Sequence, residues 1–134
     1  MNSNGKSTKN GKRRMFEVSV EAGFKATHAV MVAGVDETPH EHEWKVVVLV
    51  NGDTLDDDGL VIDFLALEKS LDGIIEPLRD ADLNKADVLE GKNPSAEFVA
   101  LYIGKEIEKT LPQANNLVSV TVTEAPHCKA IYKP

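Results

Sequence analysis

Three of the four histidines in this chain lie within fifteen residues: His28, and then His40 and His42, which are separated by one residue. Imidazole is the commonest protein ligand for zinc and similar ions. Alternate residues of a β-strand point to the same side, so His40 and His42 can face one ion, and His28 on a neighbouring strand would add a third ring. Three protein ligands leave one coordination position open, which is typical of a catalytic metal. Exposed histidines in a polar loop are the alternative interpretation.

Two strands are predicted to position these histidines. Apolar and polar residues alternate in both segments, which predicts strands with one buried face. The alternating apolar residues are Phe16, Val18 and Val20 in the first segment and Trp44, Val46, Val48 and Val50 in the second. Residues 32–39 between them contain Gly34 and Pro39 and predict an irregular loop. The acidic stretch 51–59 predicts a long solvated turn after the second strand.

Two amphipathic helices and two further strands follow. The first helix begins after Asp63, a suitable N-cap, and its apolar residues recur at spacings of three and four, namely Phe64, Leu67, Leu71, Ile74, Ile75 and Leu78. Pro77 is expected to end or kink it. The second helix opens within residues 93–97 and continues to Leu111, before Pro112. Alternation returns in residues 118–122, and residues 130–132 predict a short last strand.

The resulting order ββααββ predicts an α+β fold, in which both helices cover one face of a four-stranded antiparallel sheet. Such a sheet has two exposed edges. Because unpaired edges promote association, we expect the subunits to pair edge to edge into a closed barrel, as a homo-oligomer.

Composition narrows the possible functions of the 134-residue chain, which we expect to form one domain. The net charge of −7 is uneven, because residues 1–14 carry five basic and no acidic side chains while residues 15–134 carry a balance of −12. We interpret residues 1–14 as a flexible basic leader and residues 15–134 as the domain, whose acidity disfavours nucleic-acid binding. The sequence has no apolar run long enough for a membrane span and no secretory h-region. The single cysteine, Cys128, is compatible with a reducing cytoplasm.

Six segments of the chain occur in the order and spacing of a known family. They are residues 24–28, 40–42, 59–64, 83–84, 93–97 and 122–124. From about Phe16 to Tyr132 the chain resembles the 6-pyruvoyltetrahydropterin synthase / 6-carboxytetrahydropterin synthase family. This resemblance implies the tunnelling fold, in which subunits form a trimeric β-barrel and two barrels stack into a hexamer.

The resemblance also implies roles for individual residues. His28, His40 and His42 would bind Zn²⁺, which would polarise the side-chain oxygens of dihydroneopterin triphosphate or a related pterin. Glu124 matches the glutamate that anchors the pterin ring through two hydrogen bonds; an exposed acid at a strand end is the alternative. Ser95 would lie at the mouth of the same pocket, and a plain helix-entry role is its alternative.

The departures from the family pattern concern proton transfer. Asp36 occupies the position of the usual catalytic cysteine, and Arg79 and Asp80 occupy the positions of the Asp-His dyad that activates it. Arginine stays protonated at working pH and cannot replace that dyad. Glu41 replaces the glycine between the paired histidines. The metal ligands therefore remain, while the proton-transfer residues are missing.

Two hypotheses of function follow. The chain is a zinc-dependent pterin lyase with Asp36 or Glu37 as general base, and its chemistry is shifted towards aldol-type cleavage. Alternatively, it is a non-catalytic homologue that binds metal and a pterin or purine, with Asp36 or Glu37 as a fourth metal ligand. His127 and Cys128 could form a reactive pair only with a neighbouring subunit, because adjacent strand residues point to opposite faces; a surface turn is expected instead.

Overall fold

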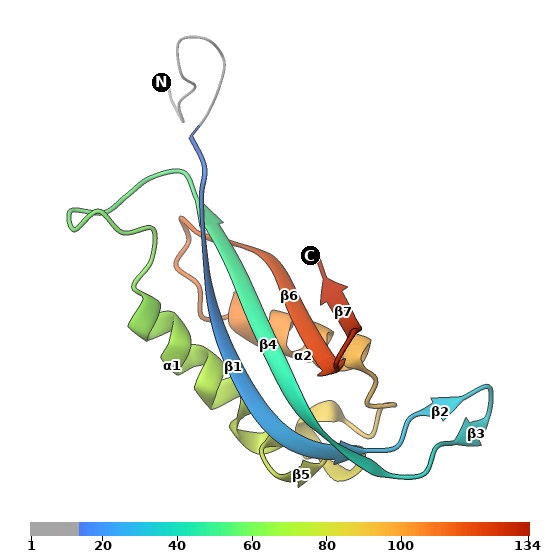
Figure 1. The fold of residues 1–134 in the computed structure, drawn as a ribbon. Helices are drawn as coiled ribbons and strands as arrows, with labels where there is room; N and C mark the ends of the chain where they lie inside the picture. Colours follow the sequence, from blue (N-terminus) through green and yellow to red (C-terminus); the bar gives the residue numbers. More distant parts are fainter. Residues whose placement is uncertain (1–13) are drawn as a thin grey trace.

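The computed structural model describes residues 14–134, and two long antiparallel strands dominate it (Figure 1). Strand β1 (Phe16–His28) pairs with β4 (His40–Gly52) along its whole length, from Phe16 opposite Gly52 to His28 opposite His40. Strand β6 (Asn116–Ala125) pairs with β4, and β7 (Cys128–Tyr132) pairs with β6. Apart from Arg14, the predicted leader lies outside the described residues.

Both helices, α1 (Phe64–Ile75) and α2 (Ala96–Glu108), cover the same face of this sheet (Figure 1). The core between the two layers is built from alternate strand residues and the inner helix faces, including Val46, Val48, Val50, Val120 and Val122 from the sheet and Leu71, Ile75, Val99, Ile103 and Ile107 from the helices. The α+β architecture predicted from the sequence is therefore confirmed. No helix in residues 14–134 is long and apolar enough to cross a membrane.

The predicted helix starts follow from local hydrogen bonds. The Asp63 side chain accepts from the backbone N–H of Leu65 at 2.9 Å, and the Ser95 hydroxyl accepts from the N–H of Phe98 at 3.1 Å. Each side chain satisfies one of the N–H groups that a helix start leaves unpaired. Pro77 lies in a 3₁₀ turn, η1 (Glu76–Leu78), so the chain turns there as α1 ends.

The structure differs from the predicted four-stranded sheet by one short strand. Strand β5 (Ala81–Asp82) pairs in parallel with β1 beside Ala26 and Thr27, which gives the order β5-β1-β4-β6-β7. Two 3₁₀ turns, η2 (Leu83–Lys85) and η3 (Asp87–Leu89), connect β5 to the segment before α2. A two-residue strand has no periodic signal of its own, so only the tertiary pairing reveals it.

The predicted irregular loop over residues 32–39 is also wrong in part, because it contains most of a small hairpin. Strands β2 (Met31–Val32) and β3 (Val35–Asp36) pair around Ala33 and Gly34, whose φ angles are +53° and +81°. A two-residue hairpin turn commonly needs positive φ at both central positions, and alanine does not signal that conformation in a sequence. The hairpin projects beyond the end of the sheet (Figure 1).

Two helix glycines have opposite surroundings, which gives a test of the packing. A Cβ added at Gly104 in α2 would lie 2.5 and 2.6 Å from ring atoms of Tyr132. Apart from the neighbouring residues and the backbone of α1 itself, no described atom lies within 4 Å of a Cβ added at Gly73 in α1. Gly73→Ala should raise the free energy of unfolding by about 0.5–1 kcal/mol, because alanine favours a helix. Gly104→Ala should lower it by about 1–3 kcal/mol, because the ring must move. Urea unfolding at one protein concentration measures both changes, and shifts of the same sign would contradict the packing of Tyr132 on α2.

Candidate functional site

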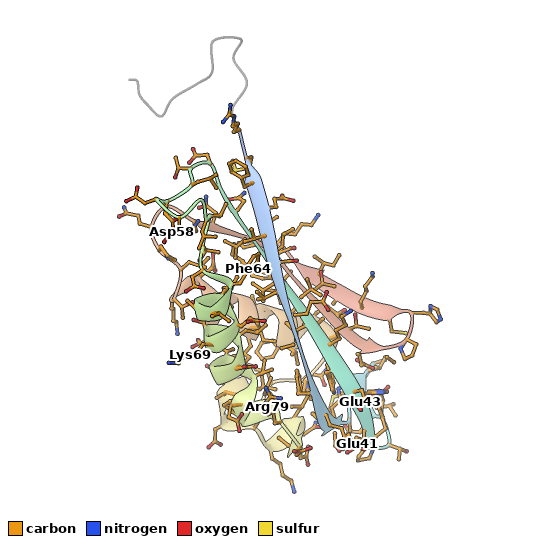
Figure 2. The ribbon with its side chains drawn as sticks, turned by 60° about the vertical axis from the view of Figure 1, so that its left-hand side comes forward. Glu41, Glu43, Asp58, Phe64, Lys69 and Arg79 are labelled. Carbon is orange, nitrogen blue, oxygen red and sulfur yellow. The ribbon has the colours of Figure 1, made fainter. Side chains whose placement is uncertain are left out.

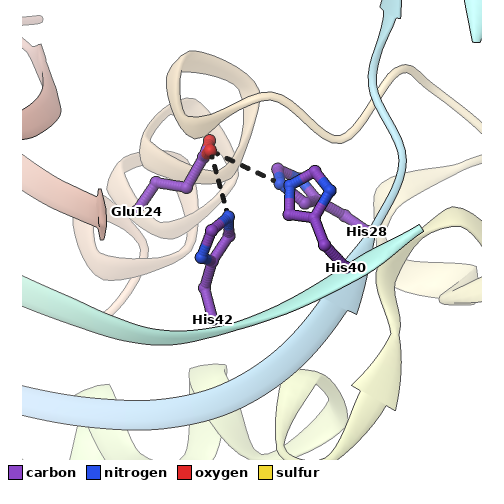
Figure 3. Close-up of side chains that lie close together, drawn as sticks. All are labelled: His28, His40, His42 and Glu124. Atoms are coloured by element: carbon purple, nitrogen blue, oxygen red, sulfur yellow. Dashed lines mark ion pairs between the residues drawn. The ribbon is translucent and has the colours of Figure 1, made fainter. Parts of the chain in front are cut away.

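The three histidines predicted to bind a metal converge at one end of the sheet (Figure 3). The strand register sets His28 opposite His40 and Ala26 opposite His42. All three side chains lie on the helix-covered face, continuing the line of buried residues that begins at Trp44. The ring centroids are 4.7 Å apart for His28 and His40, 5.5 Å for His28 and His42, and 4.5 Å for His40 and His42.

Trp44 forms the floor of this cluster. Its ring meets His28 edge-on at 4.9 Å and His42 at 6.2 Å, and its indole N–H donates to the carbonyl of Ala26 at 3.3 Å. The side chain is buried and stacks on Phe24 at 5.9 Å. The rings of His28 and His42 therefore pack against a buried aromatic pair, which restricts their rotation. Trp44 is the chain's one tryptophan, so its fluorescence reports on this site.

Backbone carbonyls orient two of the rings. Nδ1 of His28 lies 2.8 Å from the carbonyl oxygen of Pro94, and Nδ1 of His40 lies 2.8 Å from that of Thr38. A carbonyl only accepts, so Nδ1 is the donor in both rings, and in the neutral form of each imidazole the lone pair is then on Nε2. Metal-binding histidines are usually held by such a bond on the other ring nitrogen.

His28 supplies a direct test of whether the cluster suits a metal. The residue is fully buried, and its Nε2 has no hydrogen-bond partner among the described residues. Leaving a buried acceptor unpaired costs about 1–3 kcal/mol. A metal ion bound to Nε2 would satisfy this atom, so the ring suits the role of a ligand.

Glu124 completes the cluster from β6. Its Oε2 lies 3.4 Å from Nε2 of His42 and 3.5 Å from Nε2 of His28 (Figure 3). Charged hydrogen bonds are usually about 2.7–2.9 Å long, whereas ligands about 2.0–2.2 Å from a tetrahedral ion stand about 3.3–3.6 Å from one another. The ligand atoms of the three histidines and Glu124 all lie within 4.8 Å of one another. These four residues could therefore hold one divalent ion.

The surroundings of His42 favour its neutral imidazole form. Burial, and then the neighbouring His40 ring, hold the pKa of His42 below its ordinary value of 6.5, although the Glu124 carboxylate opposes this shift. His42 is thus unprotonated at neutral pH, which is the form that coordinates a metal.

The two candidate bases, Asp36 and Glu37, are placed differently. Oε1 of Glu37 accepts a hydrogen bond from the backbone N–H of Val30 at 3.0 Å and lies 3.9 Å from Nε2 of His40. Asp36 instead pairs with Met31 in the hairpin and borders a separate hollow at the hairpin base. Of the two, the structure brings Glu37 to the histidine cluster.

The residues at the positions of the Asp-His dyad have structural roles. The Arg79 guanidinium donates to the carbonyl of Gly23 at 3.2 Å and pairs with Asp72 and Glu76 at 3.2 and 3.1 Å, which ties the end of α1 to β1 (Figure 2). The backbone N–H of Asp80 donates to the carbonyl of Lys25 at 2.7 Å. The loss of the dyad stays a prediction from the family resemblance.

Glu41, which replaces the family glycine, points away from the cluster. Glu41 and Glu43 alternate with the histidines on β4 and are exposed on the other face of the sheet (Figure 2). This substitution therefore adds no charge beside the histidines.

The remaining predicted site residues lie outside the cluster. The Ser95 hydroxyl caps α2, as its alternative role required, and the preceding carbonyl of Pro94 binds His28. His127 and Cys128 are exposed in and beside the turn between β6 and β7. Neither belongs to the metal-binding group found among residues 14–134.

Sequence reasoning missed the contact between Glu124 and the histidines. The strand pattern contained the signal, because Glu124 follows Val120 and Val122 at a spacing of two on the buried face of β6. Val122 pairs with Val46 on β4, so the next inward residue of β6 lies towards the end of β4 that carries His42. The register between β4 and β6 was needed to use that signal.

Removal of one ligand tests the site. Titration with Co²⁺, followed by its visible absorption and by quenching of Trp44 fluorescence, should show one ion per chain. His40→Ala should weaken this binding by at least about 100-fold, because one imidazole ligand is lost. His127→Ala is the control, since that residue lies outside the cluster. Equal affinity in the two variants would exclude His40 as a ligand.

The chain is similar to several pterin enzymes. Residues 17–134 match the sequence profile of a family described as 6-pyruvoyl tetrahydropterin synthase. A relative from Pyrococcus furiosus, dihydroneopterin monophosphate aldolase, is 38% identical over 68% of this chain and 74% of its own length. The 6-carboxy-5,6,7,8-tetrahydropterin synthase of Bacillus subtilis is 30% identical over 89% of this chain and 86% of its own.

A solved structure shares the fold. The 6-pyruvoyl tetrahydropterin synthase of Caenorhabditis elegans superposes with a TM-score of 0.78 at 19% identity, covering 91% of this chain and 97% of its own. At this identity the similarity extends to the arrangement of strands and helices alone.

Proposed function

Because the chain belongs to the 6-pyruvoyl tetrahydropterin synthase family, we propose that it is a zinc-dependent pterin lyase that shortens the side chain of a phosphorylated dihydroneopterin by retro-aldol cleavage. The position of Glu37 beside the histidine cluster is the observation on which this proposal depends. The similarity to an aldolase that acts on dihydroneopterin monophosphate supports the cleavage of a carbon–carbon bond. The substrate is dihydroneopterin monophosphate or triphosphate, or a related pterin.

Zinc is the metal that fits the donor set best. Three imidazoles suit zinc and leave one coordination position for the substrate, whereas magnesium and calcium prefer sites made of oxygen ligands alone. When bound to the side-chain oxygens of the substrate, the ion would lower the pKa of a hydroxyl and offset the negative charge that develops there.

Glu37 is the general base in this mechanism. Its carboxylate removes the proton from the hydroxyl on the second carbon of the pterin side chain, and that carbon leaves as an aldehyde. The bond between the first and second carbons breaks, and its electron pair moves into the imine of the dihydropterin ring. Glu37 then returns the proton to the first carbon, which leaves a 6-hydroxymethyl group. A carboxylate suffices as base because an activated hydroxyl is far more acidic than a carbon-bound hydrogen.

Glu124 holds the pterin ring. Its carboxylate can accept two hydrogen bonds from the amino-pyrimidine edge, which few other side chains can do. The location of Glu124 beside His28 and His42 supports a ring bound next to the ion. Ser95 remains a candidate contact at the pocket mouth, because a hydroxyl that accepts a bond from Phe98 can still donate one.

The working enzyme is a homo-oligomer. Strand β7 forms one edge of the sheet, and β1 forms most of the other, because β5 covers it only beside Ala26 and Thr27; both edges can pair with neighbouring subunits. We infer association into the trimeric or hexameric barrel that the family resemblance implies, and a cytoplasmic location.

Product analysis tests the reaction. The zinc-loaded protein incubated with dihydroneopterin monophosphate, and separately with the triphosphate, should yield 6-hydroxymethyldihydropterin. Glu37→Gln should lower kcat by at least about 100-fold, because the base is lost. Asp36→Asn, its neighbour outside the cluster, is the matched control and should change kcat by less than about threefold. A 6-pyruvoyl or 6-carboxy product would indicate synthase chemistry, and tight pterin binding without turnover would favour the non-catalytic homologue.

Glu124→Gln separates the two roles open to Glu124. The amide keeps the shape but loses the charge and one acceptor, so pterin affinity should fall by about 10–100-fold, the loss expected for a charged hydrogen bond. Zinc content should stay at one ion per chain, held by three imidazoles. Calorimetric pterin binding and metal analysis measure the two quantities. Loss of zinc with unchanged pterin affinity would make Glu124 a structural ligand instead.

A further inference from the structure

The segment 29–31 joins the metal-site residue His28 to the hairpin that carries Glu37. Its central residue, Val30, is bound to Glu37 twice: the N–H of Val30 donates to Oε1 of Glu37 at 3.0 Å, and the carbonyl of Val30 accepts from the N–H of Glu37 at 3.0 Å. The location of the Glu37 carboxylate therefore depends on where Val30 is held.

Two asparagine side chains bind the residues on either side of Val30. The carboxamide of Asn84 accepts from the N–H of Ala29 and donates to its carbonyl, both at 2.8 Å. The carboxamide of Asn93 accepts from the N–H of Met31 at 2.8 Å and donates to its carbonyl at 3.0 Å. All six backbone polar groups of residues 29–31 thus have partners.

This pattern imitates a β-ladder. In an extended chain the backbone groups of alternate residues point to the same side. Ala29 and Met31 meet the two carboxamides on one side, and Val30 meets Glu37 on the other. The two asparagines therefore take the place of a neighbouring strand.

Both asparagines are anchored to the body of the domain. The N–H of Asn84 donates to the Asp82 carboxylate at 3.0 Å, in the turn that follows the β5 pairing with β1. Asn93 immediately precedes Pro94, whose carbonyl binds Nδ1 of His28. The carbonyl of Asn93 accepts a hydrogen bond at 2.9 Å from the N–H of Ser95, the N-cap of α2. A single short segment thus orients a metal ligand and the strand that positions Glu37.

We propose that Asn84 and Asn93 are positioning residues for the reaction, which fix residues 29–31 so that Val30 presents the Glu37 carboxylate to the metal site. This inference rests on the proposed role of Glu37 as base. Loss of either carboxamide removes two hydrogen bonds and frees the strand. Misplacement of a reacting group by about 1 Å can cost about 100-fold in rate, so the main effect falls on kcat.

A double-mutant cycle tests whether the asparagines act through Glu37. Asn84→Ala and Asn93→Ala should each lower kcat by about 10–100-fold. The KM should change by less than about threefold, and each variant should still bind one metal ion per chain. In a Glu37→Gln background the same substitutions should cause no further loss of the residual activity, because they act through the missing base. Equal losses in both backgrounds would overturn the proposal.

Asn115→Ala is the matched control for these variants. Its carboxamide donates to the carbonyl of Val61 at 3.1 Å, near Gly52 at the opposite end of β4 from His40. This variant removes a comparable hydrogen bond far from Glu37, so kcat should stay unchanged. A loss of kcat equal to that of Asn93→Ala would show a general effect on the fold and would overturn the proposal.

Amide hydrogen exchange gives a readout that needs no turnover. In both asparagine variants, protection of the Val30 and Glu37 amides should fall by at least about tenfold, while protection of Val48 in the centre of β4 stays constant. Unchanged protection of Val30 and Glu37 would overturn the positioning role, whatever the activity. If the wild-type protein shows no turnover, the proposed reaction is overturned. If the variants nevertheless lose protection, the result still supports the role of Asn84 and Asn93 in holding residues 29–31.

Discussion

The antiparallel register of β1 and β4 is the constraint on which the rest of the structure depends. It sets His28 opposite His40 and directs all three clustered histidines to the helix-covered face. A slip of one residue would turn His40 and His42 to the opposite face and would expose Trp44. The stacked pair of Phe24 and Trp44, and the buried valines beyond it, oppose such a slip. The packing that stabilises the core therefore also assembles the histidine cluster.

One backbone carbonyl couples the site to the helical layer. His28 ends β1, yet its Nδ1 is held by Pro94, at the entrance to α2. Glu124 comes from β6, so the cluster joins three strands and one helix start. A buried acceptor without a hydrogen-bond partner, as at Nε2 of His28, is costly. Bound metal would remove that cost, so metal binding and stability of this end of the sheet should be linked.

The parts of the fold that were predicted from the sequence are those with long periodic patterns or local caps. The two long strands, both helices and the caps at Asp63 and Ser95 depend on residues close together in the chain. Strand β5 and the hairpin after His28 depend on distant pairing or on positive φ at Ala33, which no local pattern signals. The sequence likewise could not show which of Asp36 and Glu37 lies beside the histidines. Their different positions depend on the hairpin of β2 and β3, which was not predicted.

Arg79 lies at a position where the family resemblance implies an acid, and its contacts give that position a structural role. Arg79 binds the carbonyl of Gly23 and two acids of the α1 region, so its position now serves to fasten α1 to β1. Restoring an acid there would remove these bonds and place a negative charge beside Asp72 and Glu76. A further acid beside the cluster is Glu37, whose carboxylate lies 3.9 Å from Nε2 of His40 and is held by Val30. A lone carboxylate is too weak a base for an unactivated carbon-bound proton but adequate for a hydroxyl beside a metal ion, which supports our proposal of a cleavage that begins at oxygen.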